Sequence, residues 1–122
     1  MTTINLFRDA RDAVEFAAGQ TVFAEGTPGD CLYVVVEGEV EITLAGKHIR
    51  TVGPGSLFGE MALIEQGPRS ATAIARTPCR VVPVNERRFN FLVQQTPFFA
   101  IQVMRIMSER LRQRDGGGTT LA

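Results

Sequence analysis

The chain has 122 residues and a mass of 13.3 kDa, which fits one domain able to bury a hydrophobic core. Hydrophobic residues make up 44% and charged residues 21%, proportions that exclude a disordered or collagen-like chain. Thirteen basic and thirteen acidic residues give a formal net charge of zero, so no overall positive field favours nucleic acid or an anionic membrane as a partner.

Glycine spacing indicates short antiparallel strands in the first half of the chain. Nine glycines fall between Gly19 and Gly67, and they separate segments in which apolar and polar residues alternate. We predict strands at Thr21–Glu25, Leu32–Glu37 and Glu39–Leu44, followed by a hairpin turn at residues 45–47. Short strands at this spacing are typical of a sandwich or jelly roll.

Strand character returns after Gly67 and Pro68. Two further strands are predicted at Ser70–Ala75 and Arg80–Val84, connected through Thr77 and Pro78. Because proline cannot donate to a sheet, we expect Pro83 at an edge strand or a strand end.

The C-terminal third changes to helical periodicity. Asn85 is predicted to cap a helix that ends near Gln95. A second helix is predicted to open at Thr96 and Pro97, with threonine as the cap and proline in the first helical position. Its apolar stripe contains Ala100, Val103, Met104, Met107 and Leu111, widened by Phe99 and Ile106. The four arginines between Arg105 and Arg114 are expected to form a solvated face together with Glu109 and Asp115.

We assign residues 1–115 to one domain and residues 116–122, which begin with three glycines, to a flexible tail. The longest apolar runs, Leu32–Val36 and Met61–Ile64, are far shorter than the roughly 20 residues that a bilayer requires. The N-terminus lacks the pattern of a signal peptide, so a cytoplasmic protein with no membrane partner is expected.

Cys31 and Cys79 lie in no Cys-x-x-Cys spacing, and both are expected to be small buried hydrophobes.

The segment Phe58-Gly59-Glu60-Met61-Ala62-Leu63 carries the clearest chemical signal. Its glycine permits a sharp turn, and the residues that follow can open a helix whose unpaired amides attract an anion. Arg69 follows Glu60 by nine residues, and its guanidinium is predicted to close over the same phosphate. A carboxylate beside a phosphate site needs a donor, and a ribose hydroxyl is one. Phosphate and ribose together indicate a nucleotide.

The combination of Phe-Gly-Glu-x-Ala-Leu with Pro-Arg-Ser-Ala-Thr at residues 68–72 resembles the phosphate-binding cassette of the cyclic nucleotide-binding domain family. This family includes catabolite activator proteins, cyclic-nucleotide-regulated channels and kinase regulatory subunits. Residues 19–30 and 32–40 also resemble its opening strands and glycine turns, so the similarity covers about residues 13–114. The resemblance implies a mainly β fold: an eight-stranded β-roll (jelly roll), a short cassette helix and two C-terminal helices. It also implies cyclic AMP or cyclic GMP as the ligand.

By position, the resemblance implies Glu60 on the ribose 2′-hydroxyl with the Gly59 backbone beside it, and Arg69 on the phosphate oxygens. In this family the final helix closes over the base, and Met104 is the residue that we predict to cap it. The full set of ligand-binding residues implied is Gly59, Glu60, Met61, Ala62, Arg69, Ser70, Ala71 and Met104. The Ser70 hydroxyl suits guanine, but related cyclic AMP binders also carry Ser or Thr there, so cyclic AMP is the expectation.

Neither a catalytic residue nor a metal ligand is predicted. His48 is the only histidine, lies near a hairpin without a nucleophile motif, and is expected at the surface. Metal-dependent cupins are also jelly rolls, but they share several ligating histidines, whereas this sequence has one histidine. We therefore expect a regulatory domain that is not an enzyme and has no cofactor besides its nucleotide ligand.

Two hypotheses for function stay open. In the first, the nucleotide draws the last helix over its base, and the helix reports occupancy to an effector protein or a second copy. In the second, the pocket is unoccupied or degenerate, and Val103, Met107 and Leu111 serve a protein-interaction or dimerisation module. Because no DNA-binding, channel or kinase region accompanies the roll, a free-standing sensor, a truncated regulatory domain and a protein-binding module are all compatible with the sequence.

Overall fold

The computed structural model describes residues 2–113. Its elements are β1 (Val14–Phe16), β2 (Thr21–Phe23), β3 (Cys31–Glu37), β4 (Val40–Leu44), β5 (Lys47–Val52), β6 (Leu57–Phe58), α1 (Met61–Ile64), β7 (Thr72–Ala75), β8 (Cys79–Asn85), α2 (Glu86–Gln95) and α3 (Phe98–Arg112). The predicted eight-stranded roll with a short helix and two C-terminal helices is confirmed within these residues. The predicted domain boundary at residue 115 and the tail at 116–122 lie outside them.

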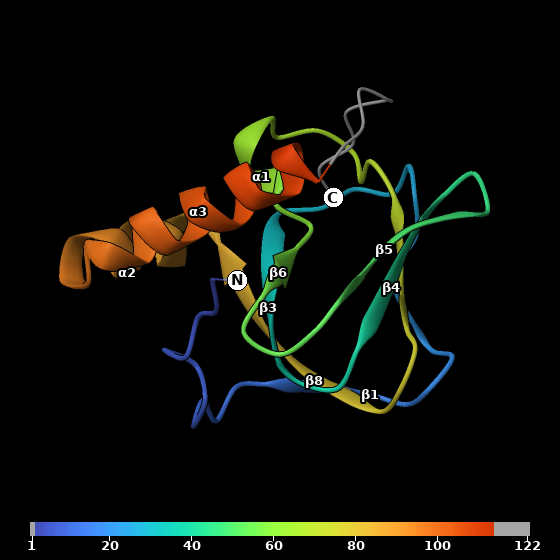
Figure 1. Cartoon of the computed structure of the whole chain (residues 1–122), viewed down its shortest axis with the longest axis horizontal. Helices are drawn as coiled ribbons and strands as arrows, with labels where there is room; N and C mark the ends of the chain where they lie inside the picture. The colour runs from blue at the N-terminus through green and yellow to red at the C-terminus, as the bar shows by residue number, and fades with distance from the viewer. Residues whose placement is uncertain (1, 114–122) are drawn as a thin grey trace.

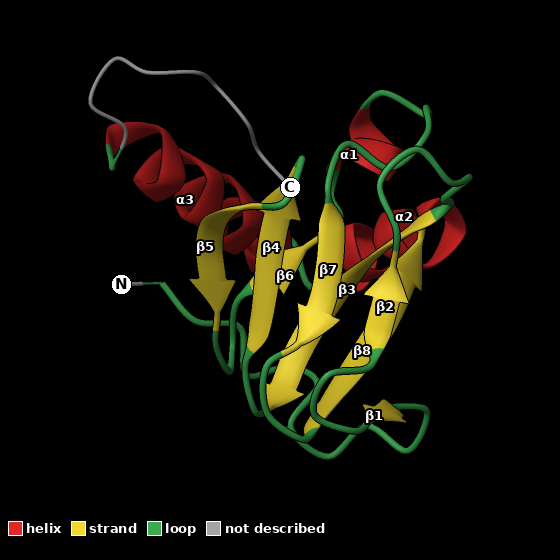
Figure 2. Cartoon of the chain, turned by 90° about the vertical axis from the view of Figure 1, so that its right-hand side faces the viewer, coloured by secondary structure: helices red, strands yellow, loops and turns green. Residues whose placement is uncertain are grey.

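Two four-stranded antiparallel sheets form the roll, in the orders β1-β8-β3-β6 and β2-β7-β4-β5. The strands curve around one another in Figure 1, with the helices gathered on one side. Arg110 of α3 contacts Leu57 of β6 and Glu60, the residue before α1. In Figure 2 the strands β5, β4, β7 and β2 follow one another across the view. The loop from β6 into α1 therefore sits where the roll meets α3.

Two hydrophobic clusters hold these layers together. The cluster inside the roll contains Val35, Val40, Ile42, Val52, Phe58, Ala71, Ala73, Ala75, Cys79 and Val81. The cluster between the first sheet and the helices contains Ile4, Phe7, Leu32, Val34, Leu57, Val82, Val84, Phe99, Val103 and Ile106. Successive residues of β3 and β8 join different clusters, so both faces of this sheet are covered. That is why residues 32–36 form an apolar run instead of alternating with polar residues.

Three of the eight strands were not located in the sequence, and each carries a weak periodic signal. β1 has three residues and β6 has two, which is too short for alternation to be visible. β5 has a register irregularity where it pairs with β4, and four of its six residues are polar or charged. Pro83 was expected on an edge strand or at a strand end. β8 is not an edge strand, because it lies between β1 and β3, but Pro83 lies near the C-terminal end of β8. The pairing of β1 stops at Val81, so within residues 2–113 Pro83 is paired only with Tyr33.

Both C-terminal helices begin near the predicted residues. The Asn85 side chain accepts a 2.8 Å hydrogen bond from the Arg88 backbone N–H, so the predicted cap of α2 is confirmed. The predicted side-chain cap of α3 by Thr96 is wrong. The connection is so short that the Thr96 amide still closes α2 on Leu92, while its backbone carbonyl accepts from Phe99.

Helix α3 packs on the roll through a narrower stripe than the sequence indicates. Its buried residues are Phe99, Val103, Ile106 and Arg110, spaced by four, three and four positions. Met104 and Leu111, expected in the stripe, are more than half exposed. The apolar side of α3 is therefore divided between the core and the surface.

Cys31 and Cys79 are free and buried, as predicted, and His48 is exposed beside Glu41. Within the described part of the chain, no helix is long and apolar enough to cross a membrane. The same residues contain no group of three or more His, Cys, Asp or Glu side chains placed to hold a metal ion.

Replacing Asn85 with alanine is expected to lower the free energy of unfolding by about 1 kcal/mol, because the first turn of α2 loses its cap. Denaturant unfolding measures this change. Asn90→Ala, at an exposed position within the same helix, is the matched control and is expected to be neutral or slightly stabilising. Equal losses in the two variants would contradict a capping role.

Candidate functional site

Gly59 shapes the turn between β6 and α1. Its φ of +78° is a left-handed conformation that side chains rarely adopt. A Cβ at this position would also lie 2.8 Å from Arg69 Nη1 and 3.1 Å from a Phe23 ring carbon. The turn needs glycine both for its backbone angle and for the close approach of Arg69.

Most of the predicted cassette residues surround one small surface pocket, which we call the cassette pocket. Its lining consists of Phe23, Gly59, Met61, Ala62, Arg69, Ser70 and Ala71. The structure thus brings together six of the eight predicted ligand-binding residues. Glu60 follows Gly59 in the chain but does not line the pocket, because its buried side chain points toward α3. Met104 does not line the pocket either.

The Arg69 side chain is buried beneath this pocket, with 5% of its surface exposed. Its Nη1 donates to the carbonyl oxygens of Cys31 at 2.7 Å and Gly59 at 3.1 Å. The guanidinium carbon lies 4.1 Å from the centre of the Phe23 ring, a cation–π distance. Nε is buried and has no hydrogen-bond partner within residues 2–113. A glycine at position 29 makes room for it, because a Cβ there would lie 2.2 Å from Nε.

The Glu60 carboxylate is also buried, with 1% of the residue exposed, and it pairs with an arginine of α3. Arg110 Nη1 lies 3.3 Å from Glu60 Oε1. Arg110 Nη2 donates to the Leu57 carbonyl and, at 3.2 Å, to the Ser56 hydroxyl. The other carboxylate oxygen, Oε2, is buried and has no hydrogen-bond partner in the described chain. One carboxylate therefore joins the cassette to α3 and keeps an acceptor unused.

Burial raises the pKa of Glu60 from 4.5 to about 6, although the positive charges of Arg110 and Arg50 act in the opposite direction. Loss of solvent is the larger effect because a buried carboxylate gives up its hydration. The same loss lowers the pKa of Arg110, and the charge of Glu60 counteracts it. The pair is thus costly to bury and stays together through mutual attraction.

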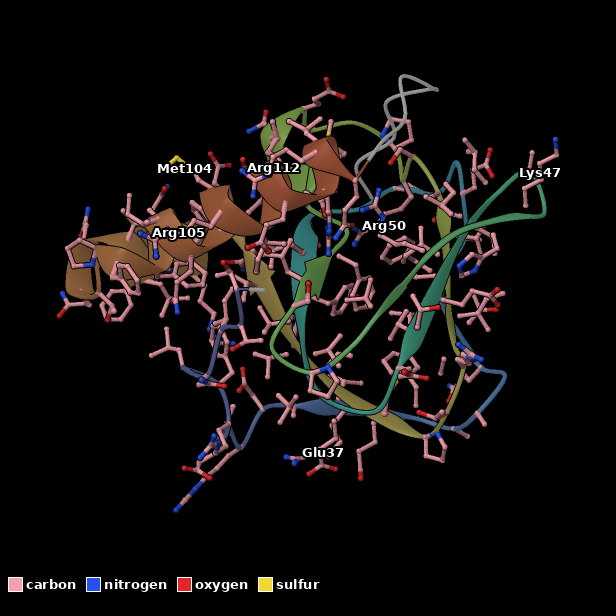
Figure 3. All side chains as sticks on the ribbon, viewed as in Figure 1. Glu37, Lys47, Arg50, Met104, Arg105 and Arg112 are labelled. Carbon is pink, nitrogen blue, oxygen red and sulfur yellow. The ribbon has the colours of Figure 1, made fainter. Side chains whose placement is uncertain are left out.

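Arg110 is a site residue that the sequence analysis missed. The expectation of a solvated arginine face on α3 is wrong for this residue, which is 6% exposed. Its spacing of four residues from Ile106 and seven from Val103 places it on the buried stripe, a signal that the sequence contains. Met104 is 56% exposed and lies on the side of α3 away from the roll (Figure 3). Its predicted contact with the base stays a prediction.

Arg50 was missed as well. It lies on β5, and Figure 3 shows it below the C-terminal part of α3. Its positive charge lowers the pKa of Glu60, as the charge of Arg110 does, so arginines from two elements act on one buried carboxylate.

Comparison with protein families matches residues 13–96 to the cyclic nucleotide-binding domain. The chain belongs to this family. The match covers the roll, the cassette and α2, and it includes every predicted ligand-binding residue except Met104.

Two relatives with curated names are regulators. The chain is 34% identical over 105 residues to a CRP-like cAMP-activated global transcriptional regulator of Mycobacterium tuberculosis, covering 82% of this chain and 47% of that protein. It is 36% identical over 87 residues to a cAMP-dependent protein kinase regulatory subunit of Aspergillus niger, covering 70% of this chain and 21% of the subunit. This chain thus spans about half the length of the first relative and about a fifth of the second.

One solved structure matches this chain over nearly the whole length of both. It comes from a study of a cyclic-GMP-dependent signalling pathway that regulates bacterial phytopathogenesis, with 30% identity and a TM-score of 0.75. The match covers 94% of this chain and 97% of that one. The chain is therefore similar both to proteins named for cyclic AMP and to a protein from a study of cyclic-GMP-dependent signalling.

The raised pKa of Glu60 makes the free energy of unfolding depend on pH. A rise from 4.5 to about 6 corresponds to about 2 kcal/mol, because each pKa unit is about 1.4 kcal/mol. The folded state holds the proton more tightly, so the contribution is fully present below pH 4.5 and is lost as the pH rises through about 6. Denaturant unfolding at several pH values between these limits measures the slope.

Glu60→Gln is the test variant, since its amide does not titrate. We expect its free energy of unfolding to show a flatter profile between pH 4.5 and 6, because the carboxyl that titrates in this range is absent. An unchanged slope in this variant would remove Glu60 as the source of the pH dependence.

Proposed function

We propose that this chain is a regulatory domain that binds a cyclic nucleotide, cyclic AMP or cyclic GMP, at Gly59, Glu60, Met61, Ala62, Arg69, Ser70 and Ala71. The observation that carries the proposal is a pair of unmet polar atoms. Arg69 Nε is a buried donor and Glu60 Oε2 a buried acceptor, each without a partner in residues 2–113. Buried polar groups are normally satisfied, so an unmet donor and an unmet acceptor on two residues of the cassette suit a ligand that offers both.

A cyclic nucleotide offers both groups. Its phosphate is an acceptor that takes charge-assisted hydrogen bonds from Arg69. Its ribose 2′-hydroxyl is a donor suited to Glu60 Oε2. Attraction to the phosphate is strong because Arg69 is largely shielded from water. Ser70 is exposed at the rim of the cassette pocket, and its amide and hydroxyl supply further donors.

Binding is sensed through the carboxylate that the ligand and α3 share. The ribose hydroxyl bonds to Oε2 while Arg110 holds Oε1. A donor on Oε2 favours the ionised carboxylate, and the ionised carboxylate attracts Arg110 more strongly. The nucleotide therefore stabilises the arrangement in which α3 lies against the cassette, which is the differential contact that a population shift requires. For Met104 to cap the base, α3 must move, because Met104 lies on the side of this helix away from the roll.

The site binds without breaking a bond. Each of its two ionisable side chains has a role in recognition, Arg69 for the phosphate and Glu60 for the sugar. The relatives that cover most of this chain's length are regulators and regulatory subunits. We infer that the output is an altered α3 surface, read by an effector protein or a second copy of the chain.

Arg69→Ala is expected to weaken the binding of cyclic AMP or cyclic GMP by about 10- to 150-fold, the range for 1.5 to 3 kcal/mol of charged hydrogen bonds. Isothermal titration calorimetry at a pH well above 6, where Glu60 is ionised, measures the change. The control is Arg76→Ala, which removes an exposed arginine paired with Glu39 and is expected to bind as the native chain does.

The native chain supplies a second test that needs no substitution. A 2′-deoxy cyclic nucleotide should bind more weakly than its parent, because Glu60 Oε2 again lacks a donor. Equal affinities of the parent and the deoxy compound would reject the ribose contact. Native affinity in Arg69→Ala would reject the phosphate contact.

A second candidate function has support from the surface of α3. Phe98, Ile101, Met104 and Leu111 are large, apolar and exposed on this helix. Such residues suit a protein-interaction or dimerisation module that works without nucleotide. A dimer seen by sedimentation, together with no heat on adding either nucleotide, would favour this function over the sensor.

A further inference from the structure

Two arginines of the described chain are almost fully buried, and they are held in different ways. Arg110 pairs with the Glu60 carboxylate. Arg69 forms no ion pair within residues 2–113, and its Nη1 donates instead to the carbonyl oxygens of Cys31 and Gly59. A buried charge is costly to keep unless another group compensates for its lost hydration. The charge of Arg69 therefore needs a partner that is not a carboxylate.

The aromatic ring of Phe23 is such a partner. The guanidinium carbon of Arg69 lies 4.1 Å from the centre of the Phe23 ring and 5.7 Å from that of the Tyr33 ring. The face of an aromatic ring is electron-rich and attracts a cation, most strongly where water is excluded. Phe23 also lines the cassette pocket beside Arg69. The sequence analysis places Phe23 only within a strand, so this contact is a feature of the folded chain.

Two further rings fix the orientation of Phe23. Phe23 lies on β2 in one sheet, whereas Tyr33 on β3 and Phe58 on β6 lie in the other. The Phe23 ring centre is 6.1 Å from that of Tyr33 and 5.8 Å from that of Phe58. Tyr33 and Phe58 pair across the β3–β6 ladder, and their rings stack at 5.3 Å. The ring that contacts Arg69 is therefore supported from the opposite sheet.

Resting on the function proposed above, we propose that Phe23 is a positioning residue for phosphate recognition: its ring holds the charged Arg69 side chain beneath the cassette pocket. A carboxylate in this place would neutralise the guanidinium and compete with the phosphate for its N–H groups. An aromatic ring attracts the cation but carries no net charge. The positive charge of Arg69 thus stays available for the anion.

Holding Arg69 in advance favours nucleotide binding for two physical reasons. An arginine side chain has many rotamers, and a ligand that must order it pays the entropy cost at the moment of binding. The ring lowers this cost because Arg69 is already in place. It also occupies space next to the guanidinium that water would otherwise fill, which keeps the attraction to the phosphate strong. Both effects act on the nucleotide through Arg69.

Phe23→Leu is the first test, read by isothermal titration calorimetry with cyclic AMP and with cyclic GMP. We expect the variant to bind about 2- to 30-fold more weakly than the native chain, the range for a cation–π contact shielded from water. Phe16→Leu is the matched control, because Phe16 packs against the same cluster inside the roll and has no cation–π contact with Arg69 in the described residues. An equal loss in the two variants would assign the effect to core packing and overturn the inference.

A positioning residue acts through its partner, so the decisive comparison repeats Phe23→Leu in the Arg69→Ala chain. With the guanidinium removed, the ring has no cation to hold, and we expect the second substitution to change the affinity less than about 2-fold. The same loss in both backgrounds would show that Phe23 acts independently of Arg69, which overturns the inference.

Fluorination separates the electrostatics of the ring from its shape. Phenylalanine with one, two or three ring fluorines at position 23 keeps nearly the native size, while each fluorine draws electron density from the face. We expect the nucleotide affinity to fall with each added fluorine, because the ring then holds Arg69 less strongly. Equal affinity across the series would leave the ring a packing role only and overturn the inference. If Phe23→Leu fails to fold by circular dichroism, this series still decides.

The outcomes separate this inference from the function on which it rests. Absence of saturable binding of either nucleotide to the native chain at millimolar concentration overturns both. Saturable binding to the native chain, with unchanged affinity in Phe23→Leu, overturns the role of Phe23 and leaves the proposed function standing.

Discussion

A buried carboxylate paired with an arginine of α3 is the constraint on which the rest of this structure depends. Glu60 is 1% exposed, and an isolated charge at that depth would be too costly to keep. Arg110 meets the charge, and it can do so only if α3 lies across the roll next to the turn at Gly59. The buried stripe of α3, from Phe99 to Arg110, and the cluster beneath it hold the helix there. The ion pair thus depends on the packing of α3, because this packing places Arg110 next to Glu60.

The same constraint explains how a small roll can act as a sensor. Arg69 donates to the carbonyl oxygens of Cys31 and Gly59, neither of which belongs to α3. Glu60 differs because its two oxygens face different partners, Arg110 on one and an unmet position on the other in residues 2–113. A ligand that completes this carboxylate changes the free energy of a contact made by α3. Coupling between site and helix then needs one residue and no long pathway.

The cassette could be predicted from the sequence because its chemistry is local. Gly59, Glu60 and Arg69 carry their signal in residue type and spacing. The structure brings Gly59 and Arg69 together at one pocket, while the Glu60 side chain pairs with Arg110. Arg50 and Arg110 could not be identified in the same way, because their roles depend on which face of β5 and α3 is buried. For Arg110, the three- and four-residue spacing marks a buried position, but arginine is a residue type that usually lies at the surface. The charge of Arg50 reaches Glu60 only in the folded chain, and no local pattern in β5 marks this.

The central claim is that the ligand and α3 meet at Glu60, and hydrogen–deuterium exchange with and without saturating cyclic nucleotide tests it most directly. The account predicts slower exchange in two places: the cassette at residues 59–71 and the last turns of α3 around Arg110. Slower exchange in the cassette with no change in α3 would contradict the coupling, because the nucleotide would then bind without strengthening the contact to the helix.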